Sequence, residues 1–334
     1  MAASASANFC HKPWNPSLDT PPRISVTPDQ LARCTEAMAS FRQKTPEMIR
    51  QEYDHLKASL DLIEEKELAG RCTVALNDAN LKKNRYPENI LPFDENRVVL
   101  ESSTDARPMA MGFINASFLS IAPSESVSQF IATQGPLQHT CEDFWEMVIQ
   151  FHCPVIVNLT RLFEYEKKTG KDKEKCFDYF QAEEGPKTFG NISIVCEWMK
   201  TTKESLVLRY LKVQRKEDPP LYVLHIHYPD WPDHGVPEET NAVRAIFKRL
   251  YCLPPKCGPI VVHCSAGIGR TGTYCAVHNT IQRILAGYKS AWDLHNTICV
   301  FRSQRYAMAR EKDQYFFCYK AIAEELKDLV SHQQ

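Results

Sequence analysis

The chain has 334 residues, of which 43% are hydrophobic and 24% are charged. This balance is ordinary for a globular protein and excludes a wholly disordered chain. The 40 lysines and arginines nearly balance 41 aspartates and glutamates, so the formal charge is -1 and no overall basic field favours nucleic acid. Apolar runs such as 154–159 are far shorter than the ~20 residues of a membrane span. We therefore expect a protein that binds neither nucleic acid nor membrane.

The cysteine content indicates a reducing compartment. Thirteen cysteines cannot all pair with one another, and the opening MAASAS lacks the basic and apolar stretches of a secretory signal. We expect mostly free thiols and a location in the cytoplasm and also the nucleus. Cys252 and Cys257, followed by His263 and Cys264, do not match the ligand spacing of a zinc site. No metal is expected.

The first elements are two helices behind a flexible leader. Residues 1–26 are rich in alanine, serine and proline and predict the leader. The sequence TPDQ at 27–30 supplies an N-cap, a proline at the first helical position and a capping-box glutamine. TPE at 45–47 repeats part of this signal, so helices are predicted over 28–42 and 46–68.

The remaining pattern predicts one α/β domain. Alternating or β-branched apolar runs predict strands over 155–159, 192–199, 205–213 and 260–263. Helical patterns cover 141–152, 239–251, 272–286 and 312–329. Because no long linker interrupts them, we expect a single domain over 27–330 around a mixed sheet, with N-terminal helices at 28–68 and the core at 69–330.

The segment HCSAGIGRT at 263–271 is the most informative part of the sequence. A buried strand delivers Cys264 to a glycine-containing loop, and a helix begins near Arg270. Gly267 and Gly269 allow the loop amides to turn inward as an anion nest, which also favours the thiolate. Arg270 can grip two oxygens of one phosphate. The segment therefore predicts a nucleophile inside a phosphate cradle.

Two other interpretations of this loop are weaker. A lone cysteine is usually a buried core thiol, but here cysteine, glycines and arginine share one strand–loop–helix context. A nucleotide-binding loop would need the pattern G-x-x-x-x-G-K-[ST], and no lysine stands in the required place.

The sequence resembles the protein-tyrosine phosphatase family, whose signature H-C-x5-R-[ST] is intact at 263–271. Supporting motifs follow in the family's order: KNRY at 83–86, FINAS at 113–117, ATQGP at 132–136, FWEM at 144–147 and WPDHGVP at 231–237. The resemblance covers about 68–329 and is greatest to the soluble plant members. It implies an α/β fold with a central, highly twisted mixed sheet flanked by helices.

The resemblance implies catalytic roles for five residues. Cys264 would be the nucleophile, Asp233 the general acid and then base on a mobile loop, and Arg270 the phosphate ligand. Thr271 and Gln314 complete the catalytic set. Phosphate would also contact the loop residues Ser265, Ala266, Gly267, Ile268 and Gly269.

Substrate depth would be set by Tyr86, whose ring makes a slot that phosphoserine is too short to fill. Five residues separate Tyr86 from Pro92, one more than is usual, so either Glu88 or Asn89 could contact the peptide backbone; Glu88 is acidic, as that role requires. Glu166 and Lys175 could belong to a loop near Asp233, although a solvated charged hairpin explains the run 164–175 better.

The largest departure from the family lies at 310–315. The sequence REKDQY stands where the family has Q-T-x-x-Q-Y, so Arg310 replaces the glutamine that positions the attacking water, while Gln314 is kept. We expect phosphocysteine formation to survive and its hydrolysis to be slowed, with Arg310 adding positive charge to the substrate pocket.

The predicted function is hydrolysis of phosphotyrosine in signalling proteins, without metal or cofactor, by a monomer. Tyrosine-phosphorylated proteins are the expected partners, and mitogen-activated protein kinases are one class among them. A second hypothesis is a weakly hydrolysing protein that traps its phosphotyrosine ligand, which Arg310 alone supports. A dual-specificity phosphatase is disfavoured by Tyr86 and by the FWEM and WPD motifs.

Overall fold

The structure is a computed structural model that describes residues 20–101, 112–121, 126–166, 169–181, 185–232 and 235–331. At its N-terminal side, α1 (Pro28–Arg42) begins with the predicted capping box between Thr27 and Gln30. The second predicted helix is too long. Helix α2 (Pro46–Asp61) stops earlier, and a separate α3 (Glu65–Gly70) follows because Glu64 is extended, with φ −69° and ψ 142°.

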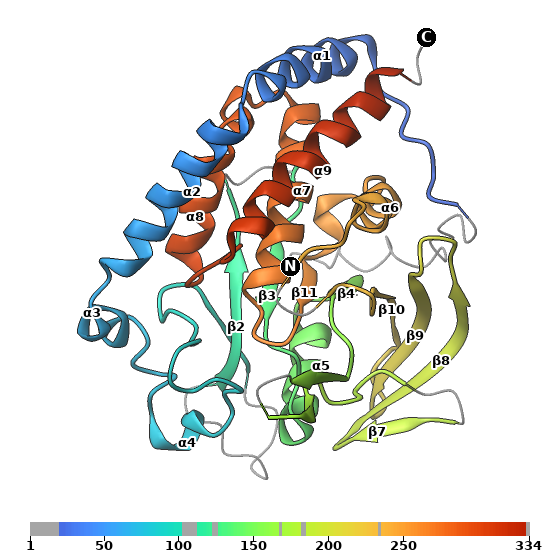
Figure 1. Cartoon of the computed structure of the whole chain (residues 1–334). Coiled ribbons are helices and arrows are strands. Elements are labelled where there is room, and N and C mark those ends of the chain that lie inside the picture. Colours follow the sequence, from blue (N-terminus) through green and yellow to red (C-terminus); the bar gives the residue numbers. More distant parts are fainter. Residues whose placement is uncertain are drawn as a thin grey trace, which may run out of the picture.

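Helix α1 packs along α7 (Gly269–Ala286) and α9 (Lys312–Ser331) (Figure 1). It buries Cys34, Ala37 and Phe41, which recur at helical spacing on one face. Residues 1–19 of the predicted leader lie outside the described residues. Further along, Ile24 packs against the core and Val26 is buried, so the last leader residues belong to the folded domain.

A twisted mixed sheet forms the centre of the molecule. Among the described residues its strands run in the order β1 (Arg97–Val99), β2 (Phe113–Leu119), β3 (Phe130–Thr133), β11 (Ile260–His263), β4 (Val155–Asn158), β10 (Leu221–His227), β9 (Val207–Arg215), β8 (Ile192–Thr201) and β7 (Lys187–Phe189). The four central strands from β3 to β10 pair in parallel, and the outer pairs are antiparallel. Buried β-branched runs suit such a centre. The predicted mixed sheet is confirmed.

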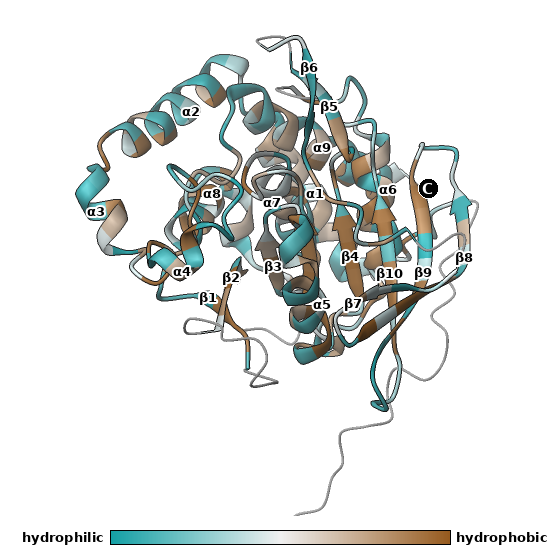
Figure 2. Ribbon diagram, turned by 90° about the horizontal axis from the view of Figure 1, so that it is seen from below, coloured by the Kyte–Doolittle hydropathy of each residue, from teal (hydrophilic) through white to brown (hydrophobic). Residues whose placement is uncertain are grey.

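Helices cover both faces of the sheet. Ile260 and Val262 of β11 join the core under α1, α7, α9 and the helices α6 (Asn241–Leu250) and α8 (Leu294–Gln304). Val261 points the other way, into the core under α5 (Cys141–Gln150). Figure 2 shows β4 and β10 as hydrophobic strands next to α5. The short elements are α4 (Asp78–Leu81), η2 (Gln138–Thr140), η3 (Pro255–Cys257), η4 (Lys289–Trp292) and the separate hairpin of β5 (Phe163–Glu166) and β6 (Lys171–Glu174).

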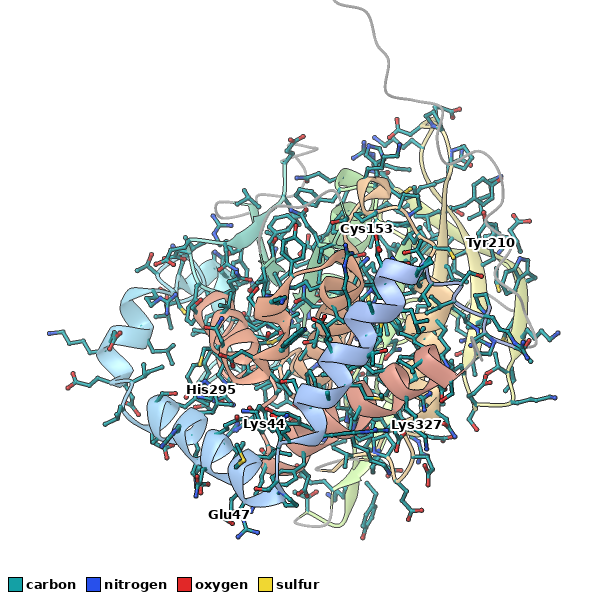
Figure 3. All side chains as sticks on the ribbon, turned by 90° about the horizontal axis from the view of Figure 1, so that it is seen from above. Lys44, Glu47, Cys153, Tyr210, His295 and Lys327 are labelled. Atoms are coloured by element: carbon teal, nitrogen blue, oxygen red, sulfur yellow. The ribbon has the colours of Figure 1, made fainter. Side chains whose placement is uncertain are left out.

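The strand-rich end of the molecule carries three stacked aromatic rings. Trp198 stacks on Tyr210 with ring centroids 5.7 Å apart, and Tyr210 stacks on Tyr222 at 5.5 Å. Such cross-strand contacts stabilise neighbouring strands. Figure 3 shows Tyr210 on this side, away from Lys44 and His295 on the helical side.

Candidate active site

Cys264 lies at the exit of β11, where the sheet ends and the loop to α7 begins. The residue is 5% exposed, and its Sγ accepts a hydrogen bond from Thr271 Oγ1 at 3.3 Å. Gly267 has φ +72°, and a Cβ there would lie 2.1 Å from the Thr133 carbonyl oxygen. Only glycine fits that position.

Four consecutive carbonyl groups of the loop are held from outside it. The donor–acceptor pairs are His263 Nδ1 to Cys264 O at 3.2 Å, Gly135 N to Ser265 O at 2.9 Å, Arg305 Nη2 to Ala266 O at 3.2 Å, and Arg305 Nε to Gly267 O at 2.8 Å. The C=O and N–H of one peptide group point in opposite directions. Outward carbonyls therefore turn the loop amides inward, toward the side where α7 begins, as an anion nest.

Arg270 is held beside this nest by a buried carboxylate. Its Nη1 lies 2.6 Å from Glu164 Oε1 and its Nη2 lies 3.1 Å from Oε2, so the contact is two-pronged. Nη1 also donates to Leu159 O at 3.2 Å and to Thr160 Oγ1 at 3.1 Å. Lys175 Nζ reaches the same carboxylate at 3.8 Å. The guanidinium is thereby fixed in orientation.

The carboxylate here is Glu164, which the sequence did not indicate. Glu166, which the sequence offered as a candidate for a loop near Asp233, lies 3.4 Å from Lys173 on the exposed β5–β6 hairpin. Strand alternation separates Glu164 from its neighbours: Phe163 and Tyr165 are 56% and 63% exposed, whereas Glu164 points inward. Hydrophobicity alone would have turned the aromatic residues inward. The expected charged hairpin is present, and Lys175 follows it at the buried site.

Tyr86 borders the other side of the loop, and its hydroxyl lies 2.9 Å from Ser265 Oγ. The neighbouring Arg85 anchors this segment by donating to Gly135 O at 3.2 Å and Pro136 O at 2.9 Å. The side chains of Glu88 and Asn89 are both exposed, so burial does not distinguish them.

The 310–315 segment approaches the loop through Gln314. A Cβ at Gly269 would lie 2.9 Å from Gln314 Nε2, so the buried amide of Gln314 contacts the loop directly. The side chain of Arg310 is 58% exposed and lies 3.7 Å from Glu311 Oε1. Its backbone carbonyl accepts a hydrogen bond from Tyr53 at 3.0 Å.

The predicted acid Asp233 lies outside the described residues. Before it in the chain, Trp231 is buried, donates to Gly235 O at 3.1 Å and packs its ring 5.7 Å from that of Phe317 on α9. The described flank of this segment is therefore anchored to the helical layer.

Burial shapes the electrostatics around the loop. It lowers the pKa of Arg305 to about 10, while Cys264 acts in the opposite direction. At neutral pH Arg305 therefore stays charged behind the nest. Burial also lowers the pKa of His263 to about 3, so this histidine is neutral.

Comparison with known proteins agrees with this geometry. The sequence model described as protein-tyrosine phosphatase matches residues 80–324, which is more than half of the chain. The chain belongs to the protein-tyrosine phosphatase family. It is 56% identical over 320 residues to protein-tyrosine-phosphatase PTP1 of Arabidopsis thaliana, covering 94% of this chain and 91% of that protein. This confirms the predicted likeness to plant members.

More distant relatives agree on the fold. The mouse (Mus musculus) tyrosine-protein phosphatase non-receptor type 20 is 35% identical over 75% of this chain, but the match spans only 55% of that protein. The catalytic domain of human protein tyrosine phosphatase non-receptor type 18 superposes with a TM-score of 0.75 at 30% identity, covering 86% of this chain and 99% of that one. The large twisted mixed sheet flanked by helices is the fold of this family.

Membership makes this phosphatase a hydrolase that acts on phosphotyrosine in proteins. In the part of the chain that the structure describes, no helix is both long enough and apolar enough to span a membrane. The structure brings Cys264, Arg270, Thr271, Gln314 and Tyr86 to one loop, as the sequence predicted.

Proposed function

We propose that this phosphatase hydrolyses phosphotyrosine through a phosphocysteine on Cys264. The thiolate attacks phosphorus, the P–O bond to tyrosine breaks, and Asp233 donates its proton to the leaving phenolate oxygen. Water then attacks phosphorus and gives a proton to Asp233, the S–P bond breaks, and phosphate and the thiolate are released. The observation that carries the proposal is the Thr271 hydrogen bond to Cys264 Sγ, beside a loop whose carbonyls at residues 264–267 are held from outside.

Phosphate binds, on this proposal, to the inward amides of residues 265–270 and to the guanidinium of Arg270. An arginine fork and several amides match the oxygens of a phosphate that carries two negative charges. The same donors stabilise the additional charge that develops on the equatorial oxygens during transfer. Glu164 holds the guanidinium of Arg270 in its orientation beside the loop.

Residues next to the loop determine substrate selectivity and the hydrolysis of the phosphocysteine. The ring of Tyr86 borders the slot for the phosphotyrosine ring, and the acidic Glu88 contacts the backbone of the substrate peptide. Gln314 positions water for hydrolysis of the phosphocysteine. Arg310 occupies the other water-positioning place and slows that step.

The decisive experiment replaces the nucleophile. Cys264→Ser removes the thiolate but keeps the cradle, so turnover of a phosphotyrosine peptide should disappear while binding persists. Turnover that survived in this variant would mean that another residue is the nucleophile.

Asp233→Ala should slow cleavage of aryl phosphates by about 10²–10⁴-fold, the usual effect of losing a positioned acid.

The proposed substrates are tyrosine-phosphorylated proteins of the cytoplasm and nucleus, including mitogen-activated protein kinases, acted on by a monomer. The charged and aromatic surroundings of the loop suit phosphotyrosine, but they do not select one protein. A pull-down with the Asp233→Ala variant from cytoplasmic and nuclear extracts tests these proposed substrates. If no mitogen-activated protein kinase were trapped, this class would be excluded as a substrate. The ligand-trapping alternative gains no support from the relatives, which are named as phosphatases.

A further inference from the structure

The β5–β6 hairpin forms a separate two-stranded sheet (Figure 2), and one of its faces is turned toward the phosphate loop. Side chains alternate along a strand, and residues paired across two antiparallel strands share a face. Glu164 of β5 is paired with Lys173 of β6. Since Glu164 holds Arg270 through two contacts, the face that carries Lys173 is the face directed at the substrate site.

Contacts with the segment that carries Tyr86 place Lys173 more closely. The ammonium group of Lys173 lies 5.9 Å from the centre of the Tyr86 ring. Arg85 fixes this approach, because its Nη1 donates to the Glu174 carbonyl at 2.8 Å and its Nη2 lies 3.2 Å from the Glu174 carboxylate. Strand β6 is thereby tied to the border of the proposed phosphotyrosine slot. Lys173 therefore lies at the rim of that slot.

The ammonium group of Lys173 is accessible to a substrate. Its side chain is 48% exposed, whereas the neighbouring side chains of Lys175 and Glu164 are only 8% and 7% exposed. The carboxylate that Lys173 contacts is Glu166 Oε1, at 3.4 Å. Exposed ion pairs of this kind are weak, so the exchange of Glu166 for a carboxylate of the substrate costs little free energy.

The charge balance of this face favours an acidic ligand. Lys171 is paired across the hairpin with Glu166, so Lys171 and Lys173 share a single exposed carboxylate. Glu164 does not compensate the second ammonium group, since both of its carboxylate oxygens already contact Arg270. The rim of the slot therefore keeps an excess of positive charge.

The other acidic side chains of β6 lie on the opposite face. Asp172 is paired with Tyr165 and Glu174 with Phe163, on the face turned away from the phosphate loop. The Glu174 carboxylate is also engaged by Arg85. A peptide that passes the rim of the slot therefore meets the lysine face of the hairpin and not these two carboxylates.

We propose that Lys173 is a specificity-determining residue, which binds the carboxylate of an acidic side chain close in sequence to the phosphotyrosine of the substrate. This inference rests on the proposed slot beside Tyr86 and adds a sequence preference to it. In the free phosphatase Glu166 holds the ammonium group, and on binding an aspartate or glutamate of the substrate takes its place. Tyr86 and Arg270 thus select phosphotyrosine itself, and Lys173 selects among the sequences that contain it.

The first test compares two phosphotyrosine peptides on the same enzyme. The peptides differ at a single position, which is glutamate in one and glutamine in the other, and this position is moved in turn along both sides of the phosphotyrosine. The ratio of the two kcat/KM values cancels any loss of folding or basal activity in a variant. The parent should prefer glutamate at one or more positions, and Lys173→Gln should lower that preference by about two- to fivefold, the effect of one exposed ion pair. Equal ratios in parent and variant at every position would overturn the proposal.

Charge reversal distinguishes a direct contact from the general field of the hairpin. Lys173→Glu should make the phosphatase prefer a peptide with lysine at the responsive position over one with glutamate. The matched control is Lys171→Glu, which makes the same charge change on the same face of β6. If the control changed the ratio as much as Lys173→Glu does, the preference would arise from overall charge and the proposed contact would be wrong.

A binding measurement repeats the comparison without turnover. In the Cys264→Ser variant, Lys173→Gln should weaken binding of the glutamate peptide more than binding of the glutamine peptide, again by about two- to fivefold. Equal weakening of both peptides would contradict a contact with the carboxylate.

The proposed function and this inference fail in different experiments. If Cys264 were not the nucleophile, Cys264→Ser would keep its turnover. If Tyr86 did not border the slot, Tyr86→Ala would still discriminate against phosphoserine. Neither result depends on the ratio of the glutamate and glutamine peptides, which tests Lys173 alone.

Discussion

At the scale of single residues, the contact between Glu164 and Arg270 sets the geometry of the site. Both side chains are more than nine-tenths buried, and two short contacts join them. Burying two charges is costly by itself, but removing one partner leaves the other charge uncompensated. The chief effect of the pair is therefore to orient the guanidinium of Arg270. Loss of the pair should lower both the free energy of unfolding and the affinity for phosphate.

Glu164→Ala tests that conclusion. The variant should lose about 3–5 kcal/mol of unfolding free energy, the usual cost of stranding a buried charge, and its KM for a phosphotyrosine peptide should rise. Urea denaturation and steady-state kinetics measure the two effects. Glu166→Ala is the control, because that carboxylate pairs with Lys173 on the exposed hairpin. The interpretation fails if both variants behave like the parent.

Arg310 stands where the family pattern Q-T-x-x-Q-Y described above has a glutamine, and we propose that it slows hydrolysis of the phosphocysteine. Stopped-flow hydrolysis of an aryl phosphate should show a burst, because phosphocysteine forms faster than it is hydrolysed. Arg310→Gln should shrink the burst and raise steady-state turnover by restoring a water-positioning amide. Lys312→Gln removes the same charge two residues away and should leave the burst unchanged. A linear progress curve in the parent, unaffected by Arg310→Gln, would exclude this role.

At the scale of elements, α2 is fastened to the segment that carries Gln314. The Glu52 carboxylate accepts hydrogen bonds from Tyr315 at 2.8 Å and Tyr319 at 2.6 Å, both on α9, and it also pairs with Lys44. One residue later, Tyr53 holds the Arg310 carbonyl. The N-terminal helices thus contribute to the position of the segment that carries Gln314, although they lie outside the family match at 80–324.

Glu52 gives this junction a pH dependence. Burial acts to raise the pKa of Glu52, but hydrogen bonds from Lys44, Tyr319 and Tyr315 outweigh it, so the pKa is lowered. A lowered carboxyl pKa stabilises the fold above the unfolded-state value and loses that contribution as pH falls through the folded value. Glu52→Gln should therefore cost about 1–3 kcal/mol at pH 7, and the difference from the parent should shrink toward pH 4.

Urea denaturation at both pH values measures this difference. Glu47→Gln is the matched control on α2, since Glu47 points outward from that helix (Figure 3), where it pairs with Arg50 at 3.2 Å and accepts a hydrogen bond from Gln51 at 3.5 Å, both on the same helix. An equal difference for Glu52→Gln at pH 7 and pH 4 would show that the carboxylate charge does not matter.

At the scale of the whole molecule, buried neutral histidines make the fold sensitive to acid. Burial is the main cause that lowers the pKa of His227 to about 4, of His263 and His278 to about 3, and of His225 well below its usual value. In the unfolded chain these rings take up protons near pH 6.5, whereas in the folded chain they do not. Stability should therefore fall as pH drops from about 6.5 toward 4, by up to about 1.4 kcal/mol per pH unit for each histidine.

His278→Gln isolates one of these contributions. Glutamine can still accept the hydrogen bond from Tyr274 but does not titrate. The slope of unfolding free energy against pH should therefore decrease by the contribution of one proton, roughly 1.4 kcal/mol per pH unit. Denaturation curves between pH 4.5 and 7 provide the slope. A parent slope near zero would mean that the buried rings are protonated in the folded state.

Much of this architecture is predictable because its signals are local. The capping box at Thr27, the buried run of β11 and the glycines of the phosphate loop are set by neighbours in the sequence, and the structure confirms each of them. Glu164 was missed because its partner Arg270 lies 106 residues away and its exposed aromatic neighbours suggested the opposite face. The contact of Tyr179 with His263 spans 84 residues and has no local pattern at all.

The proposed phosphate cradle is built from main-chain amides, and this determines which substitutions around the loop would abolish activity. Exchanging the side chain of Ser265 or Ala266 leaves every amide in place, so these positions should tolerate small replacements. The vulnerable positions form a surrounding ring, where Arg305 grips two carbonyls and where any side chain at Gly135 would collide with Cys264 O and Lys175 O. Apart from changes to Cys264, Arg270 and Asp233, loss-of-function substitutions should therefore fall on these supporting residues, which do not touch the substrate, rather than on Ser265 or Ala266.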